Sequence, residues 1–350
     1  MRLAPLLLLT ALAACSRPAE SQGAAPPAPS EAQPAGAAPA LPAAAGPRLV
    51  FPLACPAGMA CEVQNHVDHD PTTGLQDYRC GRRTYDGHDG VDIRIPDMAA
   101  QARGVDVLAA AAGRVTRLRD GTPDVSIRAA GAPPVTGREC GNGVVIDHGD
   151  GWETQYCHLA NGSIRVRTGD VVAAGQPIAR VGLSGATEFA HLHLGVRHAG
   201  RMLDPFAPEP ASAAACQPQS TMWTPEAARR LAYHAGTILN AGFAAGPVTS
   251  DAVEAGGVAA PTADAPWLVP YVRAIGLEGG DRIELTLQAP DGEVLAKDTQ
   301  GPLDRDKAQY LMFIGKKRPP QGWPGGAYTA RVRVLRGGQA VAEQTYSVRL

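Results

Sequence analysis

The sequence predicts a mainly β protein: an antiparallel β core followed by a small β-sandwich. Between residues 105 and 206, short apolar runs alternate with turns rich in Gly, Asp and Pro, and no long helical pattern interrupts them. Residues 267–350 alternate polar and apolar side chains with a period of two, which is typical of strands with one buried face. The hydrophobic fraction of 45% with only 5% aromatic residues suits a core built largely from Ala, Val and Leu.

The length and charge of the chain limit the classes of function. A chain of 350 residues has room for two or three domains. Lys and Arg number 32 against 34 Asp and Glu, which leaves a formal net charge of -2. There is therefore no electrostatic case for a nucleic-acid partner.

The first 15 residues are predicted to be an export signal. Met1 and Arg2 precede an apolar run that is too short to span a bilayer as a helix. The run ends in Leu-Ala-Ala-Cys15, which resembles a bacterial lipoprotein processing box and implies cleavage before Cys15 and a lipid on that cysteine. The alternative is an ordinary secretory leader with a coincidental cysteine. Because Ser16 is no inner-membrane retention signal, we expect a periplasmic protein anchored to the outer rather than the inner membrane.

Residues 16–47 are predicted to be a disordered tether. They are Ala, Pro, Ser, Gly and Gln with almost nothing to bury. Such a tether would let the following domain move several nanometres from a membrane anchor.

Six further cysteines indicate disulfides in an exported chain. They are Cys55, Cys61, Cys80, Cys140, Cys157 and Cys216. We expect Cys140 to pair with Cys157, because the two flank a predicted hairpin whose outer ends meet. The other four are expected to hold the N-terminal segment and the residues near Cys216 on the core.

Two stretches carry residues that can bind a metal. In residues 189–196, His191 and His193 alternate with apolar residues, so a strand would place both rings on one face, about 6–7 Å apart. Upstream, His88 and Asp92 would lie about 13 Å apart on a straight strand, but the glycines at 87 and 90 allow the chain to bend. Two imidazoles and one carboxylate leave a fourth position for water, which is the pattern of a catalytic zinc site.

These motifs resemble the lysostaphin-type (LytM-like) zinc endopeptidases, which cut peptidoglycan peptides. The likeness also includes Tyr-Cys-His158-Leu, residues 141–149, 168–171 and 174–178, and Leu-Asp-Pro-Phe at 203–206. It covers about 120–150 residues, so residues 48–222 are expected to form this domain. The resemblance implies one zinc ion on His88, Asp92 and His193, with His158 and His191 as unliganded catalytic histidines.

The function implied by the resemblance is zinc-dependent hydrolysis of amide bonds in peptidoglycan stem or cross-link peptides. Which histidine acts as the general base stays open, and Glu188 is a possible substitute. One alternative is a non-catalytic regulator that binds peptidoglycan or an amidase through the same groove. Another is a zinc amidase, but its motifs would place a Glu among the ligands, and the sequence shows none there. The predicted partners are peptidoglycan peptides and, through the lipid on Cys15, a membrane.

Other histidines are interpreted as structural or surface residues. The run 66–70 contains two His and two Asp, but it lies in a polar, turn-rich segment, so a metal role is disfavoured. His148, His198 and His234 are also interpreted as structural or surface residues. Two segments, 99–104 and 120–139, look like insertions that wall the cleft. The strand-turn motifs at 166–177 also occur in biotinyl and lipoyl carrier domains. A carrier domain needs a central Lys that can be modified, and the chain has no Lys before residue 281, so this interpretation is set aside.

The C-terminal third is predicted to be an accessory region. Residues 223–266 are expected to hold a helix, starting with Thr224 as N-cap and running to about Asn240, and then a linker. Residues 267–350 are expected to form an immunoglobulin-like β-sandwich. No catalytic constellation appears in it, so it is interpreted as a spacer, with glycan or partner binding as the alternative.

Overall fold

The structure, a computed structural model, describes residues 46–209, 216, 218 and 220–350. The predicted leader, Cys15 and nearly all of the predicted tether lie outside the described residues. Within the described part of the chain, no helix is long and apolar enough to cross a membrane. The protein is mainly β, and every pair of neighbouring strands in its sheets is antiparallel, which confirms the predicted fold class.

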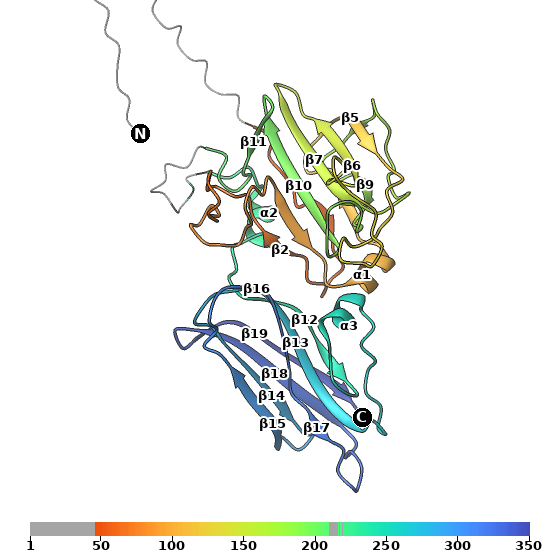
Figure 1. Ribbon diagram of the computed structural model, residues 1–350, viewed down its shortest axis with the longest axis vertical. Helices are drawn as coiled ribbons and strands as arrows, with labels where there is room; N and C mark the ends of the chain where they lie inside the picture. Colours follow the sequence, from red (N-terminus) through yellow and green to blue (C-terminus); the bar gives the residue numbers. More distant parts are fainter. Residues whose placement is uncertain (1–45, 210–215, 217, 219) are drawn as a thin grey trace, which may run out of the picture. The chain divides into compact units, whose positions relative to one another are not determined.

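The site-bearing region, strands β1 to β11, is built on one large antiparallel sheet (Figure 1). Along the sheet the strands are β2 (Glu62–Asn65), β3 (Val91–Arg94), β10 (His191–His198), β7 (Trp152–Leu159), β6 (Asn142–Asp147), β5 (Gly113–Arg119) and β8 (Val171–Val172). Strand β11 (Arg201–Leu203) pairs with β10. A smaller sheet consists of β1 (Leu53–Ala54), β4 (Asp106–Leu108) and β9 (Pro177–Arg180).

Strand β10 lies between β3 and β7 in this sheet and carries both His191 and His193. Its alternate residues Leu192 and Leu194 are fully buried in the hydrophobic core, as the period of two predicts. The register places His193 opposite Asp92 of β3 on one side and opposite Cys157 of β7 on the other. The alternation in β10 therefore fixes which of its side chains reach the two neighbouring strands.

Three disulfides link the six cysteines. Cys140 is bonded to Cys157 across the β6–β7 hairpin, as predicted. Cys80 is bonded to Cys216, so this bridge ties Cys216 itself to a residue 136 positions earlier in the chain. The remaining bridge, Cys55–Cys61, closes a loop between residues six apart, so it does not hold the N-terminal segment on a distant part of the core.

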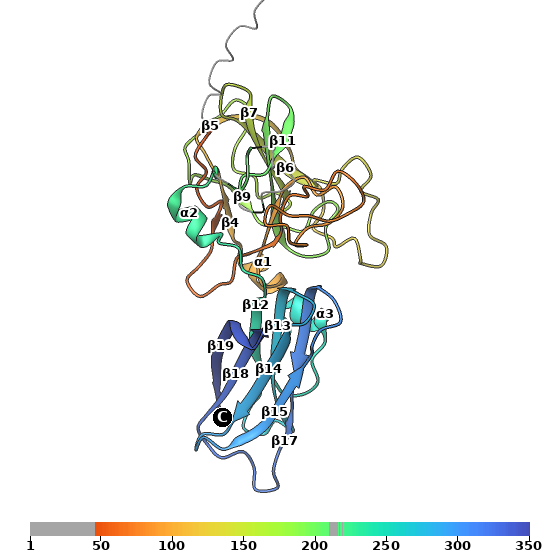
Figure 2. The same ribbon diagram turned by 90° about the vertical axis from the view of Figure 1, so that its left-hand side faces the viewer.

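The C-terminal sandwich, strands β12 to β19, consists of two antiparallel sheets (Figure 2). The first contains β12 (Thr237–Ala244), β13 (Trp267–Leu277) and β16 (Lys307–Phe313), with β17 (Lys316–Lys317) paired to β13. The second contains β15 (Val294–Gln300), β14 (Arg282–Gln288), β18 (Ala327–Arg336) and β19 (Gln339–Arg349). Alternate residues of β14 and β18, such as Leu285 and Val332, form its core.

The predicted helix up to about Asn240 is wrong. Thr224 does cap a helix, but this helix, α2, covers only Pro225–Arg230. Gly236 has a φ of 90°, and the chain then enters β12, which pairs with β13 over nearly its whole length. Pairing in the sandwich overrides the helical pattern of the Ala and Leu residues. The predicted linker also contains a helix, α3 (Ser250–Ala255).

Candidate metal centre

Three side chains from two segments converge on one point. The distance from His88 Nε2 to Asp92 Oδ1 is 3.1 Å, and that from His193 Nδ1 to the same oxygen is 2.9 Å. The two imidazole nitrogens lie 3.3 Å apart. His88 and Asp92 are buried, and His193 is nearly so. Of the described residues, these three form the group of His, Cys, Asp or Glu that can hold a metal ion.

The bend that brings His88 to this point occurs just before β3. Gly87 adopts a φ of 72°, a conformation that favours glycine. At Gly90, a Cβ would lie only 2.5 Å from Nε2 of His193. A larger residue at position 90 would therefore push the His193 ring out of place, so both predicted glycines serve the site.

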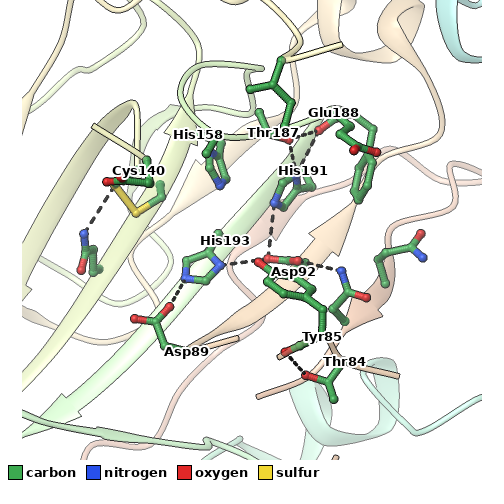
Figure 3. A pocket seen from close by; sticks show the side chains of 18 of the residues that line it. Thr84, Tyr85, Asp89, Asp92, Cys140, His158, Thr187, Glu188, His191 and His193 are labelled. Atoms are coloured by element: carbon green, nitrogen blue, oxygen red, sulfur yellow. Dashed lines mark hydrogen bonds and ion pairs between the residues drawn. A yellow bond between two sulfur atoms is a disulfide. The ribbon is translucent and has the colours of Figure 1, made fainter. Parts of the chain in front are cut away.

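Neighbouring groups orient each of the three side chains. Nδ1 of His88 donates to the carbonyl of His66 at 2.6 Å, which leaves its Nε2 lone pair directed at the cluster. Asn65 donates to Oδ2 of Asp92 at 2.9 Å, and Oδ1 of Asp89 lies 3.4 Å from Nε2 of His193 (Figure 3). With these partners, two imidazole nitrogens and one carboxylate oxygen face each other, which fits a zinc ion.

Burial and neighbouring charges shift the pKa values of Asp92 and His193. Burial opposes the charged form of Asp92, but the nearby His191 and His88 outweigh it and hold the pKa of this carboxyl well below its usual range. Burial also opposes a charge on His193, yet its hydrogen bonds to Asp89 and Asp92 raise its pKa to about 9. A cation that binds at neutral pH must therefore displace a proton from His193.

His158 and His191 lie beside this cluster, with their ring centroids 4.6 Å apart. Nδ1 of His158 donates to the carbonyl of Ser184 at 2.8 Å, and Nδ1 of His191 donates to the carbonyl of Phe189 at 2.9 Å. Both rings therefore present Nε2 as a free lone pair when neutral, and Nε2 of His191 is 3.3 Å from Asp92 Oδ1 (Figure 3). Burial, together with the charges of His191 and His193, lowers the pKa of His158 to about 3.

The backbone at His158 has an uncommon conformation. Its φ is 59°, in the left-handed region that residues other than glycine seldom adopt. The peptide N–H of His158 donates to the carbonyl of Cys140 at 2.8 Å, and Cys157 is tied to Cys140 by the disulfide. The disulfide thus lies next to the residue whose strained backbone aims an imidazole at the cluster.

Four of the five predicted site residues line one cavity of about 780 Å³ (Figure 3). Asp92, His158, His191 and His193 line it, and His88 lies directly behind them in the cluster. Ile127 and Glu139 of the 120–139 segment also line the cavity, as predicted for a wall. Residues 99–104 do not have this role, because Met98–Arg103 forms helix α1, which packs against α3 of the C-terminal region.

Sequence reasoning missed several residues that line or support the site. Asn65 and Asp89 orient metal-ligand candidates, and the ring of Tyr85 lies 4.3 Å from that of His88. Asp89 is adjacent to His88, so its proximity was available from the motif. Nothing in the sequence marks Asn65, which is placed by the pairing of β2 with β3. Glu188 lines the cavity, but its carboxylate pairs with Arg128 at 2.6 Å.

The 66–70 segment is structural, in agreement with its interpretation. The His66 ring is fully buried between the rings of Tyr78, Phe206 and Tyr233. Asp68 accepts hydrogen bonds from backbone N–H groups, including that of Gly87. These contacts support the loop that carries His88.

His69 gives this loop a pH-dependent contribution to stability. Its hydrogen bond to Asp204, 2.8 Å from Nε2 to Oδ2, and the charge of that carboxylate raise the pKa of His69 despite burial. The contribution is therefore complete below the ordinary pKa of about 6.5 and is lost as the pH rises through the higher folded-state value. We expect His69→Gln to lower the free energy of unfolding by roughly 1 kcal/mol at about pH 5.5 and by less at about pH 9.

Urea unfolding at the two pH values measures this difference. His198→Gln is the matched control, since the His198 ring stacks on Trp152 and has no carboxylate partner in the described chain. An equal loss at both pH values for His69→Gln would contradict the expectation.

His148 is also structural. Its Nδ1 lies 2.8 Å from the carbonyl of Ala112 and its Nε2 lies 2.8 Å from the Thr154 hydroxyl, so both ring nitrogens are used. At His234 the backbone carbonyl accepts a hydrogen bond from Arg83. None of these contacts reaches the metal cluster.

Comparisons with known proteins find similarity over the part of the chain that holds the site. The family described as Peptidase family M23 matches residues 86–205, which include all five site residues. Outer membrane antigenic lipoprotein B of Histophilus somni is 36% identical over 118 residues, or 34% of this chain and 28% of the relative. Cell division protein DipM of Caulobacter vibrioides is 28% identical over 121 residues, or 35% of this chain and 16% of the relative. The chain thus spans less than a third of the length of either relative.

Solved structures give weaker likenesses. A zinc-containing peptidase from Vibrio cholerae is 24% identical, covering 46% of this chain and 39% of that one, with a TM-score of 0.31. The catalytic domain of lysostaphin from Staphylococcus simulans is 20% identical, covering 41% of this chain and 89% of that one, with a TM-score of 0.28.

Proposed function

We propose that this protein is a zinc-dependent endopeptidase that hydrolyses amide bonds in peptidoglycan peptides, a proposal supported by the match of residues 86–205 to peptidase family M23. The observation that carries the proposal is the convergence of three metal-ligand candidates and two further imidazoles on one cavity. The substrate within this class is a stem or cross-link peptide, and the cavity is the proposed groove for it.

We assign zinc to His88, Asp92 and His193, where it would polarise the scissile carbonyl and activate the attacking water. His191 is the proposed proton carrier, because its Nε2 points toward the cluster and lies 3.3 Å from Oδ1 of Asp92. The proton that His191 takes from water passes to the leaving amine nitrogen as the C–N bond breaks. His158 stays neutral at physiological pH and orients the reacting groups through Nε2.

The proposed location is the cell envelope. The leader and Cys15 support an exported, lipid-anchored protein, and one relative is named as an outer membrane lipoprotein. Three disulfides fit an oxidising compartment. We propose the periplasm, with the lipid in the outer membrane.

The test uses soluble protein from residue 48 onwards, loaded with zinc and incubated with purified sacculi. Mass spectrometry of the released fragments is expected to show cross-linked dimers converted to monomers, which identifies the bond that is cut. No cleavage by protein with stoichiometric zinc would contradict the endopeptidase and favour a protein that binds peptidoglycan without cutting it.

Removing an unliganded histidine is expected to separate metal binding from catalysis. His191→Ala should keep stoichiometric zinc, because its ring is not one of the three converging ligands, while kcat falls about 10²- to 10³-fold. Zinc content and cleavage are measured on the same preparation. His148→Ala is the control, since this half-buried histidine lies outside the cavity. Loss of zinc in His191→Ala would show that the ring is a ligand instead.

A further inference from the structure

The cavity at the metal centre reaches the C-terminal sandwich. Its lining includes Gln64, Asn65 and Thr84 of the site-bearing region and Ala308 of β16. A second cavity, of about 240 Å³, is lined by the same four residues and by further residues of the sandwich. The two cavities therefore adjoin at these four residues.

Buried polar contacts hold the sandwich at this junction. Nε2 of Gln64 donates to the carbonyl of Ala308 at 2.9 Å, and its Oε1 accepts from Arg94 at 3.1 Å. Arg94 also bonds to Glu254, which in turn pairs with Arg273 of β13. Gln64 and both arginines are buried, so the wall at Ala308 is fixed rather than loosely apposed.

Strand β16 has an edge that a peptide can use. Among the described strands it pairs on one side only, with β13. The hydrogen bond from Gln64 to the carbonyl of Ala308 shows that its other edge faces the site-bearing region. An extended peptide that leaves the metal centre past Asn65 would meet the free backbone groups of this edge.

The second cavity carries charges of both signs. Arg82 and Lys307 line it together with Glu278 and Asp306. Nε of Arg82 is 3.7 Å from Oδ2 of Asp306, and both side chains are largely exposed. Leu75, Tyr233 and Leu277 also line this cavity, so the lining suits a peptide arm that carries amino and carboxylate groups on an aliphatic stem.

We propose that the sandwich is part of the substrate site, and that the second cavity is a subsite for the distal arm of a charged, cross-linked peptide. This inference rests on the proposed function for the identity of the peptide. It replaces the interpretation of the sandwich as a spacer. It implies that a short peptide with the same scissile bond is a poorer substrate, because it leaves the subsite empty.

The experiment compares Ala308→Trp in the full-length chain with wild type. Ala308 is exposed at the junction, so an indole there blocks the passage without disturbing the core. Ala340→Trp is the matched control, an exposed alanine on β19 outside both cavities. The two substrates are a cross-linked muropeptide dimer and a dipeptide with the same scissile amide.

We expect Ala308→Trp to raise KM for the dimer at least tenfold more than KM for the dipeptide, and Ala340→Trp to behave like wild type. Equal kinetics of Ala308→Trp and wild type on both substrates would overturn the inference. A matching rise in KM for both substrates would overturn it too, because it would mean general damage to the groove.

A binding measurement distinguishes this inference from the proposed function. Calorimetric titration of the dimer into zinc-free protein measures binding without catalysis. Ala308→Trp is expected to raise the Kd for the dimer at least tenfold. If wild type cleaves nothing but Ala308→Trp still weakens binding, the proposed catalysis fails and the subsite stands. If wild type cleaves the dimer but wild type and Ala308→Trp bind it equally, the subsite is refuted. The subsite is also refuted if wild type does not bind the dimer.

Discussion

Asp92→Asn is expected to abolish stoichiometric zinc binding and to lower peptidoglycan hydrolysis at least about 10⁴-fold, a loss of roughly 5–6 kcal/mol. The amide keeps the shape of the carboxylate but removes the one anion between His88, His191 and His193. The proposed zinc ion would then lack both a ligand and the charge that offsets its own. Elemental mass spectrometry measures the zinc content, and an assay with sacculi measures the rate of peptidoglycan hydrolysis.

Asp86→Asn is the control for this prediction, an exposed carboxylate in the same loop that lies outside the cavity. It is expected to retain zinc and activity. Thermal unfolding of Asp92→Asn tests whether the fold persists in this variant. Zinc-loaded and fully active Asp92→Asn would refute the assignment of the metal site.

Glu254→Ala is expected to lower the free energy of unfolding by about 3 kcal/mol. Its carboxylate pairs with both Arg94 and Arg273, whose side chains are 2% and 0% exposed. Burial lowers the pKa of Arg94 to about 10 even with Glu254 beside it, which shows how strongly this guanidinium depends on its partner. Removing the carboxylate leaves two buried cations that repel each other. Urea unfolding of the variant and of wild type measures this loss of free energy.

Glu343→Ala is the control for Glu254→Ala. This carboxylate pairs with Arg331 and Arg333 on an exposed face of the sandwich, so we expect a loss of less than about 1 kcal/mol. A similarly small loss for Glu254→Ala would mean that solvent takes over the role of the carboxylate. In that case the ion cluster does not hold the sandwich on the site-bearing region.

Much of the site could be predicted because its geometry is local. The alternation in β10 directs His191 and His193 to one face, and the glycines beside His88 permit the bend that brings it to Asp92. The hairpin between β6 and β7 brings Cys140 and Cys157 together for the same reason, since pairing across a short turn requires no distant contact.

The errors arose where distant parts of the chain compete with local preference. Residues 231–240 have a helical pattern, but β12 gains a full ladder of hydrogen bonds with β13. The 99–104 segment was expected at the cleft and instead forms a helix against α3. In both cases, burial against a segment far along the chain exceeds the small energy of local propensity.

By itself, the sequence determined the β class, the residues able to bind a metal and the disulfide beside His158, because spacing along the chain sets these. Only the tertiary structure decided that Asn65 orients the ligand candidate Asp92 and that Ala308, 220 residues from His88, lines the cavity at the cluster. Such contacts depend on how strands pair and how buried charges such as Arg94 find a partner 160 residues away. No local pattern encodes that choice, since it is made by the packing of the whole chain.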